Sequence, residues 1–150
     1  MAELATSLLG SGWMLRLRVS GTSMKPFLRS GSLLRIAPLL PSLAPPVLGD
    51  IVLLQSASGR LVAHRVIELR GDMYGTKGDS SGEADPPVGR GQILGKVLGM
   101  EGPLFLPLDG PLARRVGLCV NRLYPRLVRL KASLKRRLST TAPPLTGEGS

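Results

Sequence analysis

Ile51-Val52-Leu53-Leu54-Gln55 and Leu61-Val62-Ala63-His64-Arg65-Val66-Ile67-Glu68 are the two runs of sequence that decide the fold. Both runs are rich in aliphatic and β-branched side chains, which favour extended backbone. Residues 56–60 separate them and include a glycine, which suits a hairpin loop. The two runs therefore predict an antiparallel β-hairpin in the middle of the chain.

Further strand-like segments lie on both sides of this hairpin. Residues 14–19 alternate apolar and basic side chains, and residues 32–36 are rich in Leu and Ile. After the hairpin we expect strands at residues 73–76 and 92–98, with a further short one at residues 104–108. The sequence therefore predicts a mainly β domain.

The two ends of the chain differ from this β domain, which we place at residues 12–108. We expect residues 1–11 to form a leader segment with a weak helix. Residues 109–138 interleave Arg and Lys with leucines at steps of three and four, which predicts a basic amphipathic helical extension. A proline inside a helix removes a hydrogen bond, so we expect Pro125 to divide this extension into two pieces. Residues 139–150 are small and polar and are predicted to be disordered.

The composition limits the classes of function. The chain has 20 Lys and Arg against 10 Asp and Glu, a formal net charge of +10, which indicates an acidic partner such as anionic lipid, nucleic acid or an acidic substrate. Aromatic residues make up only 3% of the chain, so nucleic-acid binding by base stacking is disfavoured. Cys119 is the only cysteine, which excludes an intrachain disulfide and a cysteine-rich zinc site.

The sequence also bears on location. No apolar run reaches the ~18 residues that a membrane-spanning helix needs, and residues 1–15 lack the basic start and apolar core of a signal peptide. We therefore expect a protein that is cytoplasmic or peripheral at the membrane. Residues 114–138 could lie on an anionic membrane surface, or the helix could pack its leucine stripe on the β domain and leave its charges solvated. The sequence leaves both interpretations open.

Four polar side chains could have a chemical role. Ser23 lies in a turn that is bounded by a glycine and a proline, after the first expected strand. His64 is the only histidine of the chain, and Asp79 and Asp85 follow in a polar loop. A serine hydroxyl becomes a good nucleophile only with a base beside it, and imidazole is the most frequent base. Taken one at a time, these residues are more typical of a turn serine, a sheet histidine and turn-forming carboxylates than of a catalytic site.

The order of the blocks around these residues resembles that of the signal peptidase I family. The matching blocks are Val-Ser-Gly-Thr-Ser-Met-Lys-Pro-Phe-Leu at residues 19–28, Gly-Asp-Ile-Val at 49–52, Ala-His-Arg-Val-Ile at 63–67, Thr-Lys-Gly-Asp-Ser-Ser at 76–81 followed by Asp85, and Ile-Leu-Gly-Lys-Val at 93–97. Together they span about residues 17–97, more than half of the chain. Typical bacterial members have lysine where this chain has His64, whereas the branch found in archaea, the endoplasmic reticulum and some Gram-positive bacteria has histidine, and the sequence is similar to that branch. Self-cleaving repressors share the Ser-Met turn and the sheet, but they use a lysine base and usually have a DNA-binding domain.

The resemblance implies both a fold and an activity. The fold would be a partly closed antiparallel β-barrel of the type found in signal peptidases and self-cleaving repressors. The activity would be that of a serine endopeptidase that cleaves signal or leader peptides after small residues, with Ser23 as nucleophile, His64 as general base and Asp85 as the third member. Asp79 would be a supporting residue that shapes the loop. The substrate, a peptide or preprotein, would be bound by Val19, Ser20, Gly21, Met24, Leu61 and Val62, and no metal or organic cofactor is implied.

Two departures from the family pattern keep other interpretations open. Many members have serine two positions before the nucleophile, where this chain has Gly21, so the second donor to the oxyanion would come from Ser20 or Thr22. Members are usually anchored by a transmembrane helix, so this chain would instead either lie on an anionic membrane through its basic stretch or trim a dedicated partner or leader peptide in the cytoplasm. An unidentified partner subunit is a further possible partner. The alternative function is a catalytically silent β-barrel binding module whose basic tail contacts membrane or nucleic acid.

Overall fold

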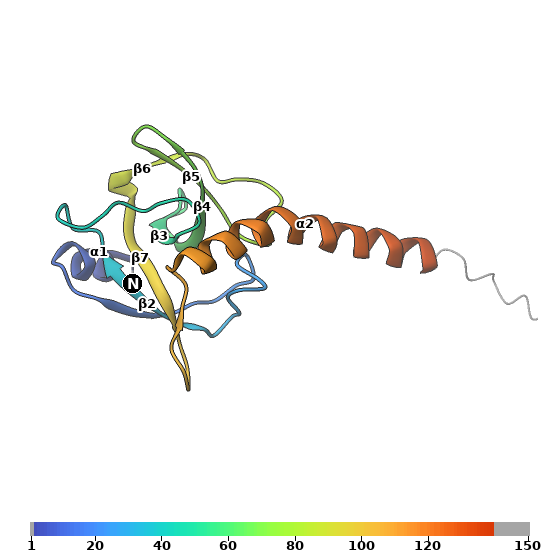
Figure 1. Cartoon of the computed structure of the whole chain (residues 1–150), viewed down its shortest axis with the longest axis horizontal. Coiled ribbons are helices and arrows are strands. Elements are labelled where there is room, and N and C mark those ends of the chain that lie inside the picture. Colours follow the sequence, from blue (N-terminus) through green and yellow to red (C-terminus); the bar gives the residue numbers. More distant parts are fainter. Residues whose placement is uncertain (1, 140–150) are drawn as a thin grey trace, which may run out of the picture.

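The computed structural model describes residues 2–139, in which two α-helices accompany a single β-sheet (Figure 1). In chain order the elements are α1 (Ala2–Gly10), β1 (Leu15–Arg18), β2 (Leu33–Pro38), β3 (Ile51–Gln55), β4 (Leu61–Arg70), β5 (Met73–Lys77), β6 (Val88–Gly89), a 3₁₀ turn (Arg90–Gln92), β7 (Ile93–Glu101), β8 (Leu106–Pro107) and α2 (Pro111–Ser139). The predicted strands are all present, with bounds that differ by a few residues, and the two-residue strand β6 was not indicated by the sequence. Residues 140–150, most of the segment predicted to be disordered, lie outside the described residues.

The sheet is antiparallel and open. Within residues 2–139, eight strands pair in the order β1-β2-β7-β3-β4-β5-β6, and β8 pairs with β7. The predicted mainly β, antiparallel architecture is confirmed. The sheet is not closed into a barrel, because β1 and β6 lie at opposite ends of the pairing order.

The predicted hairpin forms the centre of this sheet. β3 and β4 pair along the whole of β3, so that Val52 lies opposite His64, and the other edge of β3 pairs with β7. The side chains of β3 alternate between two core clusters, one with Ile51 and Leu53 and the other with Val52 and Leu54. Both faces of β3 are therefore buried, which explains why its sequence is a continuous apolar run.

The turn between β1 and β2 is fixed to the larger of these two clusters. Its Met24 and Leu28 side chains are almost completely buried there together with Leu34 of β2. Burial of a large apolar side chain stabilises a structure by about 2 kcal/mol. Ser23, which directly precedes Met24, is therefore held by a well-anchored segment although its own side chain is exposed.

Helix α2 runs without interruption through Pro125, so the prediction that this proline divides it was wrong. A proline has no N–H to donate to the carbonyl four residues earlier, which here is that of Asn121. That carbonyl instead accepts a hydrogen bond from Lys77 Nζ of β5 at 2.9 Å. The gap in the helical ladder is thus filled from the sheet, which explains why the helix can continue.

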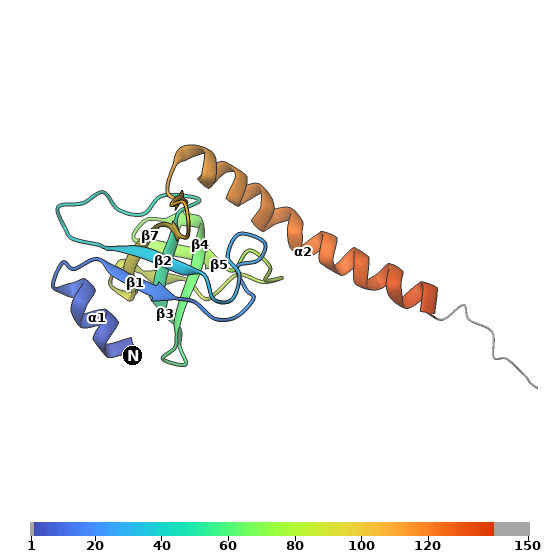
Figure 2. The ribbon, with the colours of Figure 1, turned by 90° about the horizontal axis from the view of Figure 1, so that it is seen from below.

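One face of α2 lies on the β domain, and the leucine stripe is on the other. Gly117, Asn121 and Pro125 are buried, whereas the leucines of the stripe are more than half exposed. These leucines are Leu123, Leu127, Leu130, Leu134 and Leu138. The interpretation in which the stripe packs on the β domain is therefore wrong. The last part of α2 projects away from the sheet in both views (Figures 1 and 2). Within residues 2–139, neither helix combines the length and the hydropathy of a membrane span.

Candidate active site

Ser23 is held in position by the loop that follows β5. The Ser80 N–H donates to the Ser23 carbonyl at 2.8 Å, and the Ser80 hydroxyl donates to the Thr22 carbonyl at 2.7 Å. At Gly78 the loop passes so close to the turn that a Cβ would lie 2.7 Å from the Ser23 carbonyl oxygen. Glycine at position 78 therefore allows the two segments to meet.

The structure brings Ser23, His64 and Asp85 together, although they lie far apart in the sequence. The His64 Nε2 atom is 3.3 Å from Ser23 Oγ, and His64 Nδ1 is 2.6 Å from Asp85 Oδ2. His64 is 8% exposed, whereas Ser23 is open to solvent. The imidazole thus lies between a hydroxyl and a carboxylate, the order in which a serine nucleophile is activated.

Thr76 of β5 positions the Asp85 carboxylate. The Asp85 N–H donates to the Thr76 carbonyl at 2.8 Å, and the Thr76 hydroxyl donates to Asp85 Oδ2 at 2.8 Å. Burial by itself would raise the pKa of Asp85, but the hydrogen bonds from His64 and Thr76 outweigh it and hold the pKa below its ordinary value. Asp85 is therefore a carboxylate at neutral pH.

Thr76→Val tests this account of Asp85. The variant keeps the shape of the side chain but removes one hydrogen bond to the ionised carboxylate, so the pKa of Asp85 should rise toward that of an ordinary aspartate. Stability from a carboxylate with a lowered pKa is lost as the pH falls from the unfolded-state pKa through the folded-state pKa, so in the variant this loss should be smaller and complete at a higher pH. An NMR titration of the Asp85 carboxyl carbon measures the shift. Thr6→Val, at an exposed position of α1, is the control, and an unchanged Asp85 titration in Thr76→Val would contradict the account.

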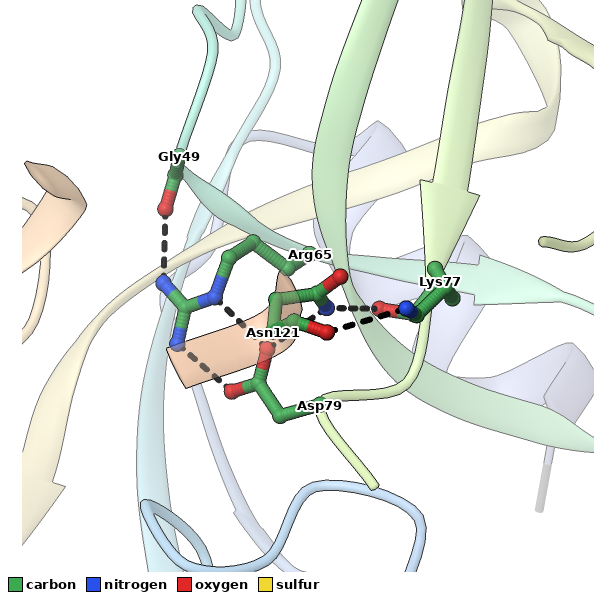
Figure 3. A network of polar contacts seen from close by, with 5 residues as sticks. All are labelled: Gly49, Arg65, Lys77, Asp79 and Asn121. Carbon is green, nitrogen blue, oxygen red and sulfur yellow. Dashed lines mark hydrogen bonds and ion pairs between the residues drawn. The ribbon is translucent and has the colours of Figure 1, made fainter. Parts of the chain in front are cut away.

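Asp79 pairs with Arg65, the neighbour of His64 on β4 (Figure 3). Arg65 Nε donates to Asp79 Oδ1 at 2.8 Å, and Nη2 donates to Oδ2 at 2.7 Å. The Nη1 group donates to the Gly49 carbonyl at 2.8 Å. The Arg65 side chain is 1% exposed and that of Asp79 0%. Because consecutive residues of a strand point to opposite faces, this ion pair lies across β4 from the imidazole and ties the Asp79 loop to the strand.

Helix α2 completes this network from outside the sheet. The Asn121 Nδ2 group donates to Asp79 Oδ1 at 2.8 Å and to the Lys77 carbonyl at 3.3 Å. Figure 3 shows Asn121 between Asp79 and Lys77. One turn earlier in the helix, Gly117 leaves room for the Arg65 guanidinium, which a Cβ at that position would strike. The first half of α2 is therefore part of the structure that holds the Asp79 loop.

Sequence patterns did not identify Arg65, Thr76 or Asn121 as members of the site. One signal was present for Asn121, which lies four residues before Pro125, where a helical carbonyl has no intrahelical donor. Arg65 and Thr76 lie within predicted strands, and only their burial and hydrogen bonds distinguish them from other strand residues.

A cleft of about 660 Å³ opens beside Ser23 and His64. The residues expected to bind substrate all line it: Val19, Ser20, Gly21, Met24, Leu61 and Val62. Gly21 has a φ of 100°, a conformation that strains any residue with a side chain, so serine does not suit this turn. Ser20 and Thr22 line the same cleft and are the candidates for a second oxyanion donor. The described part of the chain contains no group of three or more His, Cys, Asp or Glu side chains that could hold a metal ion.

Ser23, His64 and Asp85 supply the groups that acyl transfer through a serine ester requires. The hydroxyl can attack a carbonyl, the imidazole can accept and return its proton, and the carboxylate can orient the imidazole. Comparison of the chain with protein-family models, with curated proteins and with solved structures gives no match in any of the three, so the chemistry of this site rests on its own geometry.

Proposed function

We propose that the protein is a serine endopeptidase of the signal peptidase I type, which cleaves signal or leader peptides after small residues. The observation that supports this proposal most is the unbroken chain of contacts from Ser23 Oγ through the His64 imidazole to the Asp85 carboxylate. The blocks of sequence that resemble the family include Ser23 and His64, and Asp85 follows one of them. In this proposal the open antiparallel sheet is a version of the partly closed barrel of that family.

The reaction begins when a peptide carbonyl occupies the cleft beside Ser23. His64 Nε2 accepts the Ser23 proton as Oγ attacks the carbonyl carbon, and the Ser23 N–H donates to the oxyanion that forms. The protonated His64 gives this proton to the leaving amine, which leaves an ester on Ser23. Water, with His64 again as the base, attacks the ester, and the protonated His64 returns its proton to Ser23 Oγ as the ester bond breaks and the peptide acid leaves. Asp85 stays ionised throughout and holds the Nδ1–H group.

The strand edges beside the cleft suit an extended peptide. β1 lies at one end of the pairing order, so one of its edges is unpaired within the described chain. The pairing of β4 with β5 begins only at Arg65, so residues 61–64 have one unpaired edge. Residues 61–64 line the same cleft as Leu17 and Arg18 of β1. A peptide bound between these edges would add a strand and point alternate side chains to one side. Val19 and Met24 would then face the first and third residues before the cut.

Cleavage of synthetic leader peptides tests the proposal. Wild type should cleave peptides that have alanine at the first and third positions before the cut, because the resemblance to the family implies small residues there. Ser23→Ala should lower kcat by about a million-fold, since it removes the nucleophile. Mass spectrometry of the products locates the cut. Ser30→Ala changes an exposed serine outside the cleft and should cleave as wild type does.

Two outcomes would contradict the proposal. Equal cleavage by Ser23→Ala and wild type would exclude Ser23 as the nucleophile. No cleavage of any peptide by folded wild type, together with saturable binding of the same peptides, would favour the binding module in place of the enzyme.

A further inference from the structure

The outward face of α2 presents a row of exposed leucines. Leu123, Leu127, Leu130 and Leu134 are between 52% and 61% exposed. At about 3.6 residues per turn, this leucine row lies roughly 150° around the helix from the buried residues Gly117, Asn121 and Pro125. The same helix therefore has two distinct faces: a small and polar face that holds the Asp79 loop, and an apolar face that points away from the domain.

Positive charges border the leucine row on both sides. Arg122 and Arg126 lie along one border, and Lys131 and Lys135 lie along the other, all of them exposed. The helix contains nine Arg and Lys residues and no Asp or Glu, so it supplies nearly all of the excess positive charge of the chain. Basic side chains at the borders of an apolar stripe can bury their methylene stems and extend their charges to anionic groups.

The combination of leucines and charges favours an anionic lipid surface over the other occupants of such a face. Steps of three and four residues also suit a coiled coil with a second copy, but two such helices would bring nine positive charges each with no carboxylate to offset them. A nucleic acid would neutralise the arginines but leave the leucines in water, and Tyr124 is the only aromatic residue of the helix that could stack on bases. An anionic bilayer accommodates both the leucines and the charges.

We propose that α2 docks the protein on an anionic membrane surface. The helix lies in the plane of the interface, with the leucine row among the outer acyl carbons and the bordering Arg and Lys residues at the headgroups. The opposite face keeps its contacts with the Asp79 loop through Asn121, so docking leaves the support of the site unchanged. This inference goes beyond the peptidase proposal and does not depend on it.

Vesicle flotation with the full-length protein tests the docking surface. Wild type should bind vesicles with about one-third phosphatidylglycerol at least about 100-fold more tightly than vesicles of phosphatidylcholine alone. The variant Leu127→Gln/Leu130→Gln/Leu134→Gln should lose at least about 100-fold in affinity for the anionic vesicles, because three side chains no longer enter the apolar layer. The control Leu4→Gln/Leu69→Gln/Leu104→Gln changes three exposed leucines outside α2 and should bind as wild type does. Circular dichroism checks that all variants keep their helix content.

A second variant keeps the test decisive if the triple leucine variant does not fold. Arg126→Gln/Lys131→Gln/Lys135→Gln retains every leucine and should lose most of the preference for anionic over neutral vesicles. The proposal is overturned if wild type does not float with anionic vesicles, or if it binds both kinds of vesicle equally. It is also overturned if the leucine variant binds like wild type, if a DNA or RNA oligomer binds more tightly than the vesicles, or if light scattering shows a dimer that the leucine variant abolishes.

Discussion

Asp85→Asn is expected to lower kcat for leader-peptide cleavage by about ten-thousand-fold while the protein stays folded. The amide has nearly the size of the carboxylate, and its NH₂ group can take the position of Oδ2, the atom that both His64 Nδ1 and the Thr76 hydroxyl contact, with Thr76 Oγ1 then an acceptor. Its NH₂ group can donate to His64 Nδ1, which then has to be the unprotonated nitrogen of the ring. The proton would move to Nε2, which could no longer accept the proton of Ser23 across the 3.3 Å contact. The measurement is kcat and KM with the same peptide, and KM should change little because Asp85 lies on the far side of the imidazole from the nucleophile.

Asp72→Asn is the matched control for this result. Asp72 lies in the exposed turn between β4 and β5, so its amide variant makes the same change of charge away from the site. It should cleave at the rate of wild type. A loss of less than about tenfold in Asp85→Asn, with an unchanged fold, would show that Asp85 does not orient the base.

The strands could be predicted from the sequence because their signal is local. The apolar run of β3 and the Gly-containing loop after it need no knowledge of the rest of the chain. The strand order could not be predicted, because β7 enters between β2 and β3 and this pairing depends on which apolar faces are buried together. The continuity of α2 was missed for the same reason, since the donor that replaces the Pro125 N–H comes from Lys77, 44 residues before Asn121.

The candidate site shows the same division between local and long-range information. Ser23, His64 and Asp85 could be named from the sequence because each has a side chain with a known chemical role. Ser23 and His64 also fall in blocks whose order resembles that of the family, and Asp85 follows such a block. Arg65 and Asn121 could not be named. In a sequence, an arginine in a strand and an asparagine in a helix are typical of exposed positions. Here the sheet register and the contact of α2 with the sheet bury both of them against Asp79.

Asp79→Ala is expected to lower the free energy of unfolding by about 3–5 kcal/mol. The variant deprives the Arg65 guanidinium, whose side chain is only 1% exposed, of its carboxylate partner, and it removes an acceptor of Asn121. A loss of this size is a large share of the about 5–15 kcal/mol that stabilises a typical domain. Urea unfolding followed by circular dichroism measures it. Glu68→Ala is the control, because it breaks a solvent-exposed ion pair with Arg70 and should cost less than about 1 kcal/mol.

A second substitution separates the cost of the buried charge from the cost of the lost loop contacts. Arg65→Met in the Asp79→Ala background removes the unpaired guanidinium, so the double variant should be more stable than Asp79→Ala alone, although it also gives up the hydrogen bond to Gly49. If the double variant is less stable than Asp79→Ala, the unpaired guanidinium costs less than its hydrogen bond to Gly49 contributes, and most of the cost of Asp79→Ala lies in the lost contact with Asn121. Ser80, in the same loop as Asp79, donates its N–H to the Ser23 carbonyl. Asp79→Ala should therefore also lower the cleavage activity, even at urea concentrations at which the protein is still folded.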